Sequence, residues 1–195
     1  MSTKKIESDA RDRIIETALN LFYTQGYLAT GINQIIAESK VAKATFYAHF
    51  PSKEALCLAY LQARHILWMG WLKESVAGNK STTEKLTGIF KFLEMWMSES
   101  NFRGCAFLNI ATEIPSIDSK IRDEVIKHKD DLQAYIKDII QALIESDSSF
   151  SELDAQQTAK IVYVLVEGAI VSSQNYSATW PIKAAQKAVK NLLKL

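Results

Sequence analysis

The sequence predicts an all-α protein, and three observations carry that prediction. Its 195 residues include only 7 glycines and 3 prolines, and such a scarcity of helix-interrupting residues favours long helices. Apolar residues recur at helical spacing almost throughout, and no segment has a strand pattern of any length. The composition, 48% hydrophobic and 23% charged, is typical of a packed globular chain rather than a disordered one.

The first three expected helices are short and end by Phe50. Apolar periodicity marks a helix from about Ser8, and Gly26 provides its stop, as glycine commonly does beyond a last turn. A second helix ends near Ser39, and a third covers Lys43–Phe50. Their apolar positions predict one small core that contains Ile14, Ala18, Phe22, Ile35, Val41, Phe46 and Phe50.

Three further helices are expected before Pro115, which stops the last of them. Ser52 can cap a long fourth helix, and Glu54 suits the positive end of its dipole. The expected bounds are about Ser52–Gly78, Ser81–Ser98 and Cys105–Glu113.

Three more helices complete the chain. Asp118 is the expected cap of a long seventh helix, and Asp154 or a neighbour begins the eighth. Pro181 suits the first turn of the ninth helix, because that turn does not use its N–H groups. The seventh and eighth helices are expected to end at about Ser146 and Tyr176.

The eighth helix also predicts a homodimer. Residues 161–173 are apolar around much of the helix, so that helix needs covering on more than one side. Small residues such as Gly168 allow another helix to approach closely. We therefore expect a homodimer through helices near 154–176 and 180–194, with burial inside one chain as the alternative.

Charge, cysteine and histidine usage limit the function classes. The net charge is +1, and residues 1–53 hold seven Lys or Arg against five Asp or Glu, which permits DNA binding without arguing for it strongly. Cys57 and Cys105 form no metal-binding motif, so we expect no metal and no cofactor. No glycine-rich phosphate loop or histidine–nucleophile pattern is present, so we expect no catalytic residues and no enzyme.

The sequence also predicts the cellular compartment. The N-terminal residues are polar and lack the apolar core of a signal peptide. No run approaches the roughly 18 apolar residues of a membrane span. We therefore expect a soluble, cytoplasmic protein.

Residues 30–56 hold the most informative pattern. They predict two short helices joined by a tight turn and followed at once by the start of another helix. The second short helix is expected to bury Phe46 and Phe50. Its expected outward residues are Lys43, Ala44, Thr45, Tyr47 and His49. A short helix with such a polar outward face suits the major groove of DNA.

Residues 1–56 resemble the N-terminal domain of the TetR/AcrR family of transcriptional repressors. The matching residues are Leu21–Tyr27, Ala29, Thr30, Ile32, Ile35, Val41, Thr45–Tyr47, His49, Phe50 and Ser52–Leu56. The resemblance implies a helix-turn-helix DNA-binding domain at residues 1–50 and a helical ligand-binding and dimerisation domain at residues 51–195. It also implies a repressor that binds a palindromic double-stranded operator and is released by a small molecule.

Phosphate contacts and base contacts are assigned to different residues. Thr30, Tyr47 and Lys53 are placed to reach phosphates, which position the duplex. Lys43 and Thr45 are the candidates for reading base edges. The full set of predicted DNA-binding residues is Thr30, Lys43, Ala44, Thr45, Tyr47, His49 and Lys53.

Several of these assignments have structural alternatives. Ala44 is expected to touch a thymine methyl group. By the resemblance, Thr45, Tyr47, His49 and Lys53 fall where family members contact DNA. The alternatives are that Tyr47 only packs, that His49 only caps or packs, and that Lys53 is a solvated charge.

Two residues depart from the family pattern in the turn that aims the third helix. Lys40 stands where the family usually has glycine, and a positive φ would cost a lysine about 1 kcal/mol, so this turn is expected to be either mildly strained or altered. Ala42 stands where the family often has serine, and a lost side-chain cap costs about 1 kcal/mol.

The larger domain is expected to bind a small molecule, as in the resembled family. The candidate ligand-binding residues are His65, Trp68, Trp96, Phe107, Asn109, Glu113 and Tyr135. They are mainly aromatic with a few polar groups, as in ligand sites between helices, although each is alternatively an ordinary core residue. Glu113 best distinguishes a ligand-binding role from an ordinary core role, because a carboxylate in an apolar segment should be paired, exposed or turned to a ligand.

Two other functions fit the same sequence. One alternative is a helical small-molecule-binding protein whose DNA binding is weakened or lost, which Lys40, Ala42 and the low net charge allow. The other is an activator or a ligand-independent regulator.

Overall fold

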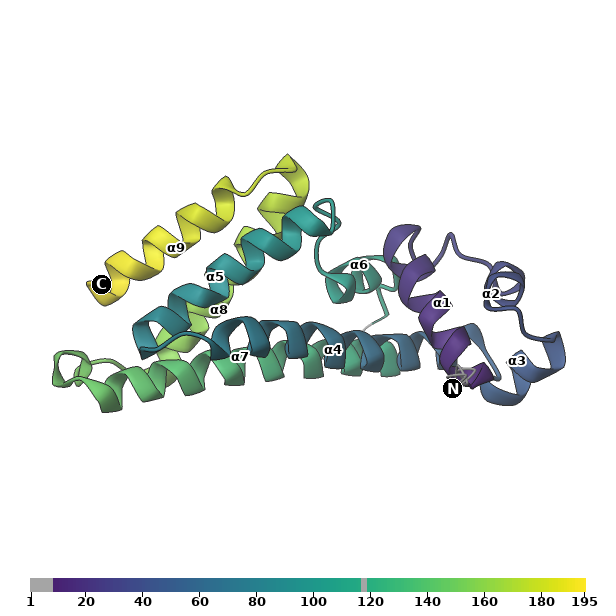
Figure 1. The fold of residues 1–195 in the computed structure, drawn as a ribbon, viewed down its shortest axis with the longest axis horizontal. Coiled ribbons are helices and arrows are strands. Elements are labelled where there is room, and N and C mark those ends of the chain that lie inside the picture. The colour runs from purple at the N-terminus through teal and green to yellow at the C-terminus, as the bar shows by residue number, and fades with distance from the viewer. Residues whose placement is uncertain (1–8, 117–118) are drawn as a thin grey trace, which may run out of the picture. The chain divides into compact units, whose positions relative to one another are not determined.

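The computed structural model describes residues 9–116 and 119–195. Within these ranges it is all-α, as predicted, with nine α-helices, a short 3₁₀ helix and no strand (Figure 1). The helices are α1 (Ala10–Thr24), α2 (Ile32–Ser39), α3 (Lys43–His49), α4 (Lys53–Ala77), α5 (Thr82–Glu99), α6 (Ala106–Glu113), α7 (Lys120–Ser146), η1 (Ser148–Phe150), α8 (Ala155–Tyr176) and α9 (Trp180–Leu193). In the described ranges, no helix is long and apolar enough to cross a membrane.

Short polar side chains begin the helices where the sequence predicts. Ser52, Ser81 and Asp154 each accept a hydrogen bond from the backbone N–H three residues further on, at 2.9–3.1 Å. These bonds satisfy N–H groups that have no partner within the helix. The predicted cap Asp118 lies outside the described residues, and the Ser119 hydroxyl accepts from the N–H of Arg122 at 3.1 Å.

The chain divides into two compact units. The first unit comprises the described parts of Met1–His65 and Ala106–Val125, and the second comprises Ile66–Cys105 and Ile126–Leu195. Helices α4 and α7 therefore each begin in the first unit and end in the second. The first unit is larger than the domain expected at residues 1–50, because it also includes the start of α4 and all of α6.

The core of the first unit contains the predicted residues. Ile14, Ala18, Phe22, Ile35, Phe46 and Phe50 are at most 3% exposed, whereas Val41 is half-buried. The Phe22 ring packs edge-on against Tyr60 of α4, with ring centroids 5.3 Å apart. The Arg64 guanidinium donates a 2.7 Å hydrogen bond to the Leu19 carbonyl. These contacts hold α4 against α1.

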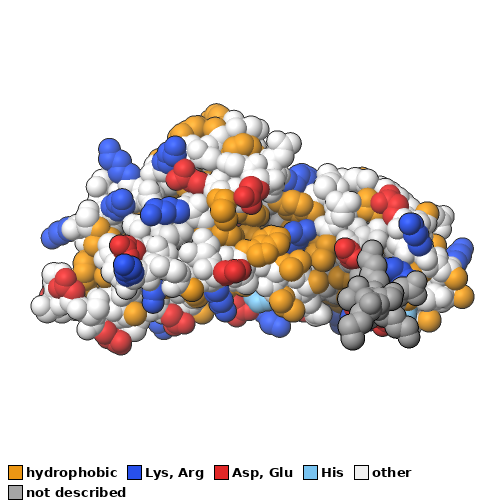
Figure 2. Space-filling view, in the orientation of Figure 1, with side chains coloured by type: hydrophobic (Ala, Val, Ile, Leu, Met, Phe, Trp, Pro, Cys, Tyr) orange, Lys and Arg blue, Asp and Glu red, His pale blue; other side chains and the backbone are white. Residues whose placement is uncertain are grey.

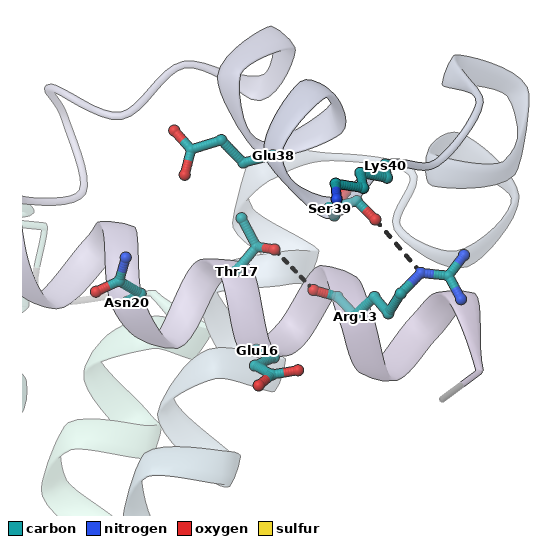
Figure 3. A pocket seen from close by; sticks show the side chains of 7 residues that line it. All are labelled: Arg13, Glu16, Thr17, Asn20, Glu38, Ser39 and Lys40. Carbon is teal, nitrogen blue, oxygen red and sulfur yellow. Dashed lines mark hydrogen bonds between the residues drawn. The ribbon is translucent and has the colours of Figure 1, made fainter. Parts of the chain in front are cut away.

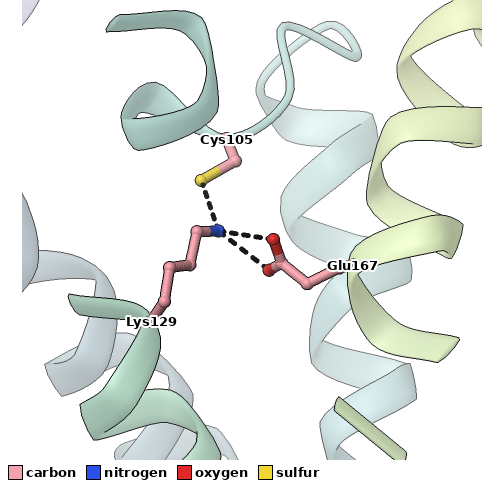
Figure 4. Close-up of polar contacts among 3 residues, drawn as sticks. All are labelled: Cys105, Lys129 and Glu167. Atoms are coloured by element: carbon pink, nitrogen blue, oxygen red, sulfur yellow. Dashed lines mark hydrogen bonds and ion pairs between the residues drawn. The ribbon is translucent and has the colours of Figure 1, made fainter. Parts of the chain in front are cut away.

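In the second unit, α8 packs against α9 and α5 (Figure 1). A polar contact joins α7 to α8 within this unit. The Lys129 ammonium lies 2.7 and 2.8 Å from the two carboxylate oxygens of Glu167 and 3.4 Å from Cys105 Sγ (Figure 4). The Lys129 and Glu167 side chains are only 12% and 17% exposed, so they form a largely buried ion pair.

The turn between α2 and α3 is strained at Lys40, which is one of the two outcomes that the sequence left open. Lys40 adopts φ 54° and ψ 43°, a left-handed conformation that favours glycine. The Val41 N–H donates to the Ile36 carbonyl at 3.4 Å, which closes the end of α2. Arg13 of α1 donates from Nε to the Ser39 carbonyl at 3.4 Å (Figure 3). A solvent-facing hollow of about 380 Å³ adjoins this turn and is lined by Arg13, Glu16, Thr17, Asn20, Glu38, Ser39 and Lys40.

Replacing Lys40 with glycine should therefore stabilise the protein. We expect Lys40→Gly to raise the free energy of unfolding by about 1 kcal/mol, because glycine adopts this φ without steric cost. Urea unfolding measures the change. Lys40→Ala is the control: it removes the same charge but keeps a Cβ, so it should gain much less. Equal stabilities for the two variants would contradict this explanation.

Candidate nucleic-acid interface

Helix α3 has one face in the protein and one face in solvent. Phe46 is fully buried within α3, and Phe50, which follows the helix, is 3% exposed. Lys43, Ala44, Tyr47 and His49 are exposed, and Thr45 is half-buried. The Phe46 ring packs edge-on against the Tyr47 ring at 5.3 Å, and the Arg11 guanidinium lies 5.6 Å from the Phe50 ring centroid. The buried side therefore fixes the direction of the exposed side.

The start of this helix lacks a side-chain cap, as Ala42 predicts. The residue takes an extended conformation, with φ −69° and ψ 147°, but its methyl group cannot accept a hydrogen bond. The first N–H groups of α3 therefore receive no side-chain acceptor from position 42.

Lys53 begins α4 and lies against the turn between α1 and α2. Its ammonium is 3.5 Å from the Leu28 carbonyl oxygen and 4.4 Å from the centroid of the Tyr27 ring. Partial burial lowers the pKa of Lys53 from its usual 10.5, while Cys57 and Glu113 nearby act in the opposite direction. The lysine is half-buried rather than a freely solvated charge.

Thr30 is placed differently from the prediction. Its side chain is fully buried, and its hydroxyl donates to the Gly26 carbonyl at 2.7 Å. A hydroxyl held inside the turn cannot also reach a phosphate. The structure therefore assigns the Thr30 side chain to the turn after α1 and removes it from the DNA-contact candidates.

The distribution of surface charge does not by itself mark a DNA-binding surface. Figure 2 shows basic and acidic side chains interspersed on the visible face, without one continuous basic patch. This distribution agrees with the net charge of +1. With a net charge of only +1, affinity for DNA would depend on a few specific contacts rather than on long-range electrostatic attraction.

Glu113 is the residue whose role the sequence did not reveal. Its carboxylate, at the end of α6, accepts hydrogen bonds from the backbone N–H groups of Tyr27 at 3.2 Å and Leu28 at 2.6 Å. Gly26 has φ +100°, and a Cβ there would lie 3.1 Å from the Glu113 carboxylate. Of the three readings that the sequence left open, Glu113 is paired, and we remove it from the ligand candidates.

The other ligand candidates fall into both units. His65, Phe107 and Asn109 belong to the first unit, and Trp68, Trp96 and Tyr135 belong to the second. Trp68 contacts Trp96 with ring centroids 5.5 Å apart. It also contacts Phe92 at 5.4 Å and His128 at 5.5 Å.

Two of these ligand candidates, Trp68 and Tyr135, have notable polar groups. The Trp68 indole N–H is buried, and none of the described residues accepts a hydrogen bond from it. The Lys73 ammonium lies 5.9 Å from the Tyr135 ring, and partial burial raises the pKa of Tyr135. No group of three or more metal-ligating side chains occurs in the parts of the chain that the structure describes.

Two family models match the chain. Residues 14–60 match the model described as bacterial regulatory proteins of the tetR family, and residues 82–189 match a tetracycline-repressor-like C-terminal domain. The second match alone covers more than half of the 195 residues.

Curated relatives and solved structures agree with these matches. The HTH-type transcriptional regulator LmrA of Bacillus subtilis is 26% identical over 193 residues, 95% of this chain and 97% of that protein. The HTH-type transcriptional repressor NemR of Escherichia coli K12 is 21% identical over 192 residues, 97% and 96% of the two chains. A TetR-family transcriptional regulator from Streptomyces coelicolor has a similar fold, with a TM-score of 0.80, 23% identity and coverage of 95% and 94%.

Proposed function

Because the chain belongs to the TetR family of bacterial regulatory proteins, we propose that it represses transcription from a palindromic operator and leaves that operator when a small molecule binds. The protein is a helix-turn-helix transcriptional regulator, as its relatives are. We propose three further things: which residues contact DNA, which surface forms the dimer, and how the protein responds to a ligand.

The division of α3 into a buried and an exposed side carries the DNA-contact proposal. Phe46 anchors the helix, and Lys43, Ala44, Tyr47 and His49 face solvent from the same short element. Lys43 and Thr45 would read base edges, with Ala44 against a thymine methyl group. Tyr47, His49 and Lys53 would contact phosphates and fix the register of the helix in the major groove.

An apolar stripe along α8 supports a homodimer. Ile161, Val164 and Val171 are 37%, 65% and 41% exposed, and Gly168 is exposed between them. Their spacing places them on one side of the helix. On α9, the residues Ile182, Ala185, Val189 and Leu193 are buried within the chain, whereas Leu192 is 41% exposed. The stripe and Leu192 would pack against the same residues of a second copy, because a two-fold interface uses one patch twice.

The aromatic cluster around Trp68 supports a ligand site in the second unit. A buried indole N–H without an acceptor is costly, and a bound molecule with an acceptor group would satisfy it. Trp96 and Phe92 would supply apolar contacts to the same molecule. A ligand can release the operator only if it binds the DNA-free conformation more tightly than the DNA-bound one.

DNA binding by the proposed face of α3 is testable without knowing the operator. A duplex would be selected from a random pool with the wild-type protein, and gel-shift affinities would be measured for Lys43→Ala and Tyr47→Ala. Loss of a base contact costs about 1–3 kcal/mol and the proposed dimer would lose two, so we expect Lys43→Ala to weaken binding by roughly 30- to 10⁴-fold and to relax sequence choice. Tyr47→Ala should weaken binding to all sequences about equally.

Lys91→Ala is the matched control, because Lys91 is an exposed lysine on α5 in the second unit. The substitution removes the same charge as Lys43→Ala but outside α3, so it should leave the DNA sequence selectivity unchanged. Wild-type affinity and sequence choice in both α3 variants would contradict the assignment of this face to DNA.

A further inference from the structure

We infer that Glu113 is a positioning residue for DNA binding, which holds the turn between α1 and α2 so that Lys53 is presented to a phosphate. The inference rests on the proposed DNA contact of Lys53. The residues that carry it all belong to the first unit, and they are Gly26, Tyr27, Leu28, Lys53 and Glu113.

Leu28 is the link between Glu113 and Lys53. Its backbone N–H donates to Glu113 Oε2 at 2.6 Å, and its carbonyl lies 3.5 Å from the Lys53 ammonium. The Leu28 side chain is 65% exposed, so apolar burial contributes little to holding this residue in place. The position of the Leu28 backbone therefore depends on hydrogen bonds, and the one to a carboxylate is the shortest of them.

Tyr27 provides a second connection between the same two residues. Its backbone N–H donates to Glu113 Oε1 at 3.2 Å, and its ring lies 4.4 Å beneath the Lys53 ammonium. A cation over an aromatic face is attracted by the ring, so moving the ring moves the preferred place of the ammonium. Lys53 thus contacts the Leu28 carbonyl and the Tyr27 ring, and Glu113 accepts a hydrogen bond from the backbone of each of these two residues.

Gly26 makes the close approach possible. Its φ of +100° is a backbone conformation that residues with a side chain rarely adopt, and a Cβ there would lie only 3.1 Å from the Glu113 carboxylate. Glu113 is also the last residue of α6, whose earlier residues Phe107 and Asn109 are ligand candidates. A shift of α6 would therefore reach Lys53 through two hydrogen bonds.

The test is a double-mutant cycle with Glu113→Gln and Lys53→Ala, measured on a duplex selected by the wild-type protein. Glutamine keeps the shape of the side chain but loses the charge and one acceptor. We expect Glu113→Gln to weaken binding on the order of tenfold. The slope of log affinity against log salt should fall by about 0.9 for each lost phosphate contact, and so by about 2 in a dimer. Lys53→Ala should do the same, and the double variant should lose little more.

Glu54→Gln is the charge control, because Glu54 is an exposed acid in the first turn of α4. Each glutamine variant removes one negative charge, which by general electrostatics should tighten DNA binding. Weaker binding by Glu113→Gln together with equal or tighter binding by Glu54→Gln supports positioning. Thermal unfolding of each variant shows whether the protein stays folded at the assay temperature.

Three results would overturn the inference. The first is a gain in affinity for Glu113→Gln like that for Glu54→Gln, and the second is fully additive losses in the double variant. The third is an unchanged salt slope in Lys53→Ala, which would remove the phosphate contact itself. If the wild-type protein selected no duplex, the proposed function would fail and this inference would fail with it.

Discussion

Replacing Lys129 with methionine is expected to destabilise the protein by about 3–5 kcal/mol, because it leaves the Glu167 carboxylate buried without its cation. Both carboxylate oxygens accept from the Lys129 ammonium, at 2.7 and 2.8 Å, and both side chains are less than one-fifth exposed. Methionine has a similar length and no charge. Urea unfolding at neutral pH measures the loss.

The double variant Lys129→Met with Glu167→Leu is the control for this prediction. Removing both charges leaves no unpaired group, so most of the lost stability should return. A single variant that lies within 1 kcal/mol of the wild type would show that the pair contributes little.

The pH dependence of this pair has a definite sign. Burial alone would lower the pKa of Lys129, but Cys105 and Glu167 beside it raise the pKa above its usual 10.5. A group with a raised pKa in the folded state stabilises that state fully below its unfolded pKa. The contribution of Lys129 should therefore be present at neutral pH and be lost only as the pH rises beyond about 10.5.

Introducing glutamate at Val164 and Val171 is expected to separate the dimer and to weaken operator binding by roughly 10²- to 10⁴-fold. The two valines are 65% and 41% exposed on one side of α8, so glutamates there can be solvated in a single chain. In a dimer they would be buried against like charges. Two linked reading helices bind one duplex far more tightly than one helix does, and separation removes that advantage.

Light scattering with size-exclusion chromatography measures the mass of the double variant. Met95→Glu is the control, because Met95 is 48% exposed on α5 and lies off the stripe. It should leave both mass and affinity unchanged. A Val164→Glu, Val171→Glu variant that still has twice the chain mass would contradict the proposed interface.

The fold was predictable because its signals are local. The predicted helix caps at Ser52 and Asp154 lie next to the apolar periodicity that they begin, and the structure confirms both. At Lys40 the sequence left the turn either strained or altered, and the left-handed backbone there is the strained alternative. Each of these features depends on residues a few positions apart.

The candidate site was less predictable because its contacts join distant segments. Glu113 reaches Tyr27 across 86 positions, and nothing near residue 113 marks that partner. Thr30 was predicted wrongly for a different reason. It matches the family pattern, but its hydroxyl is buried and donates to the Gly26 carbonyl. A pattern shows which residues recur, but burial decides what their side chains can touch.

Hydroxyl-radical footprinting on the selected duplex tests the central claim most directly. The wild-type protein, as the proposed dimer, is expected to protect two stretches related by a two-fold axis, with centres roughly 34–36 Å apart or a multiple of that spacing. Protection should weaken at both stretches in Tyr47→Ala. A single unsymmetrical footprint, or protection that Tyr47→Ala leaves unchanged, would contradict the claim that α3 reads a palindromic operator.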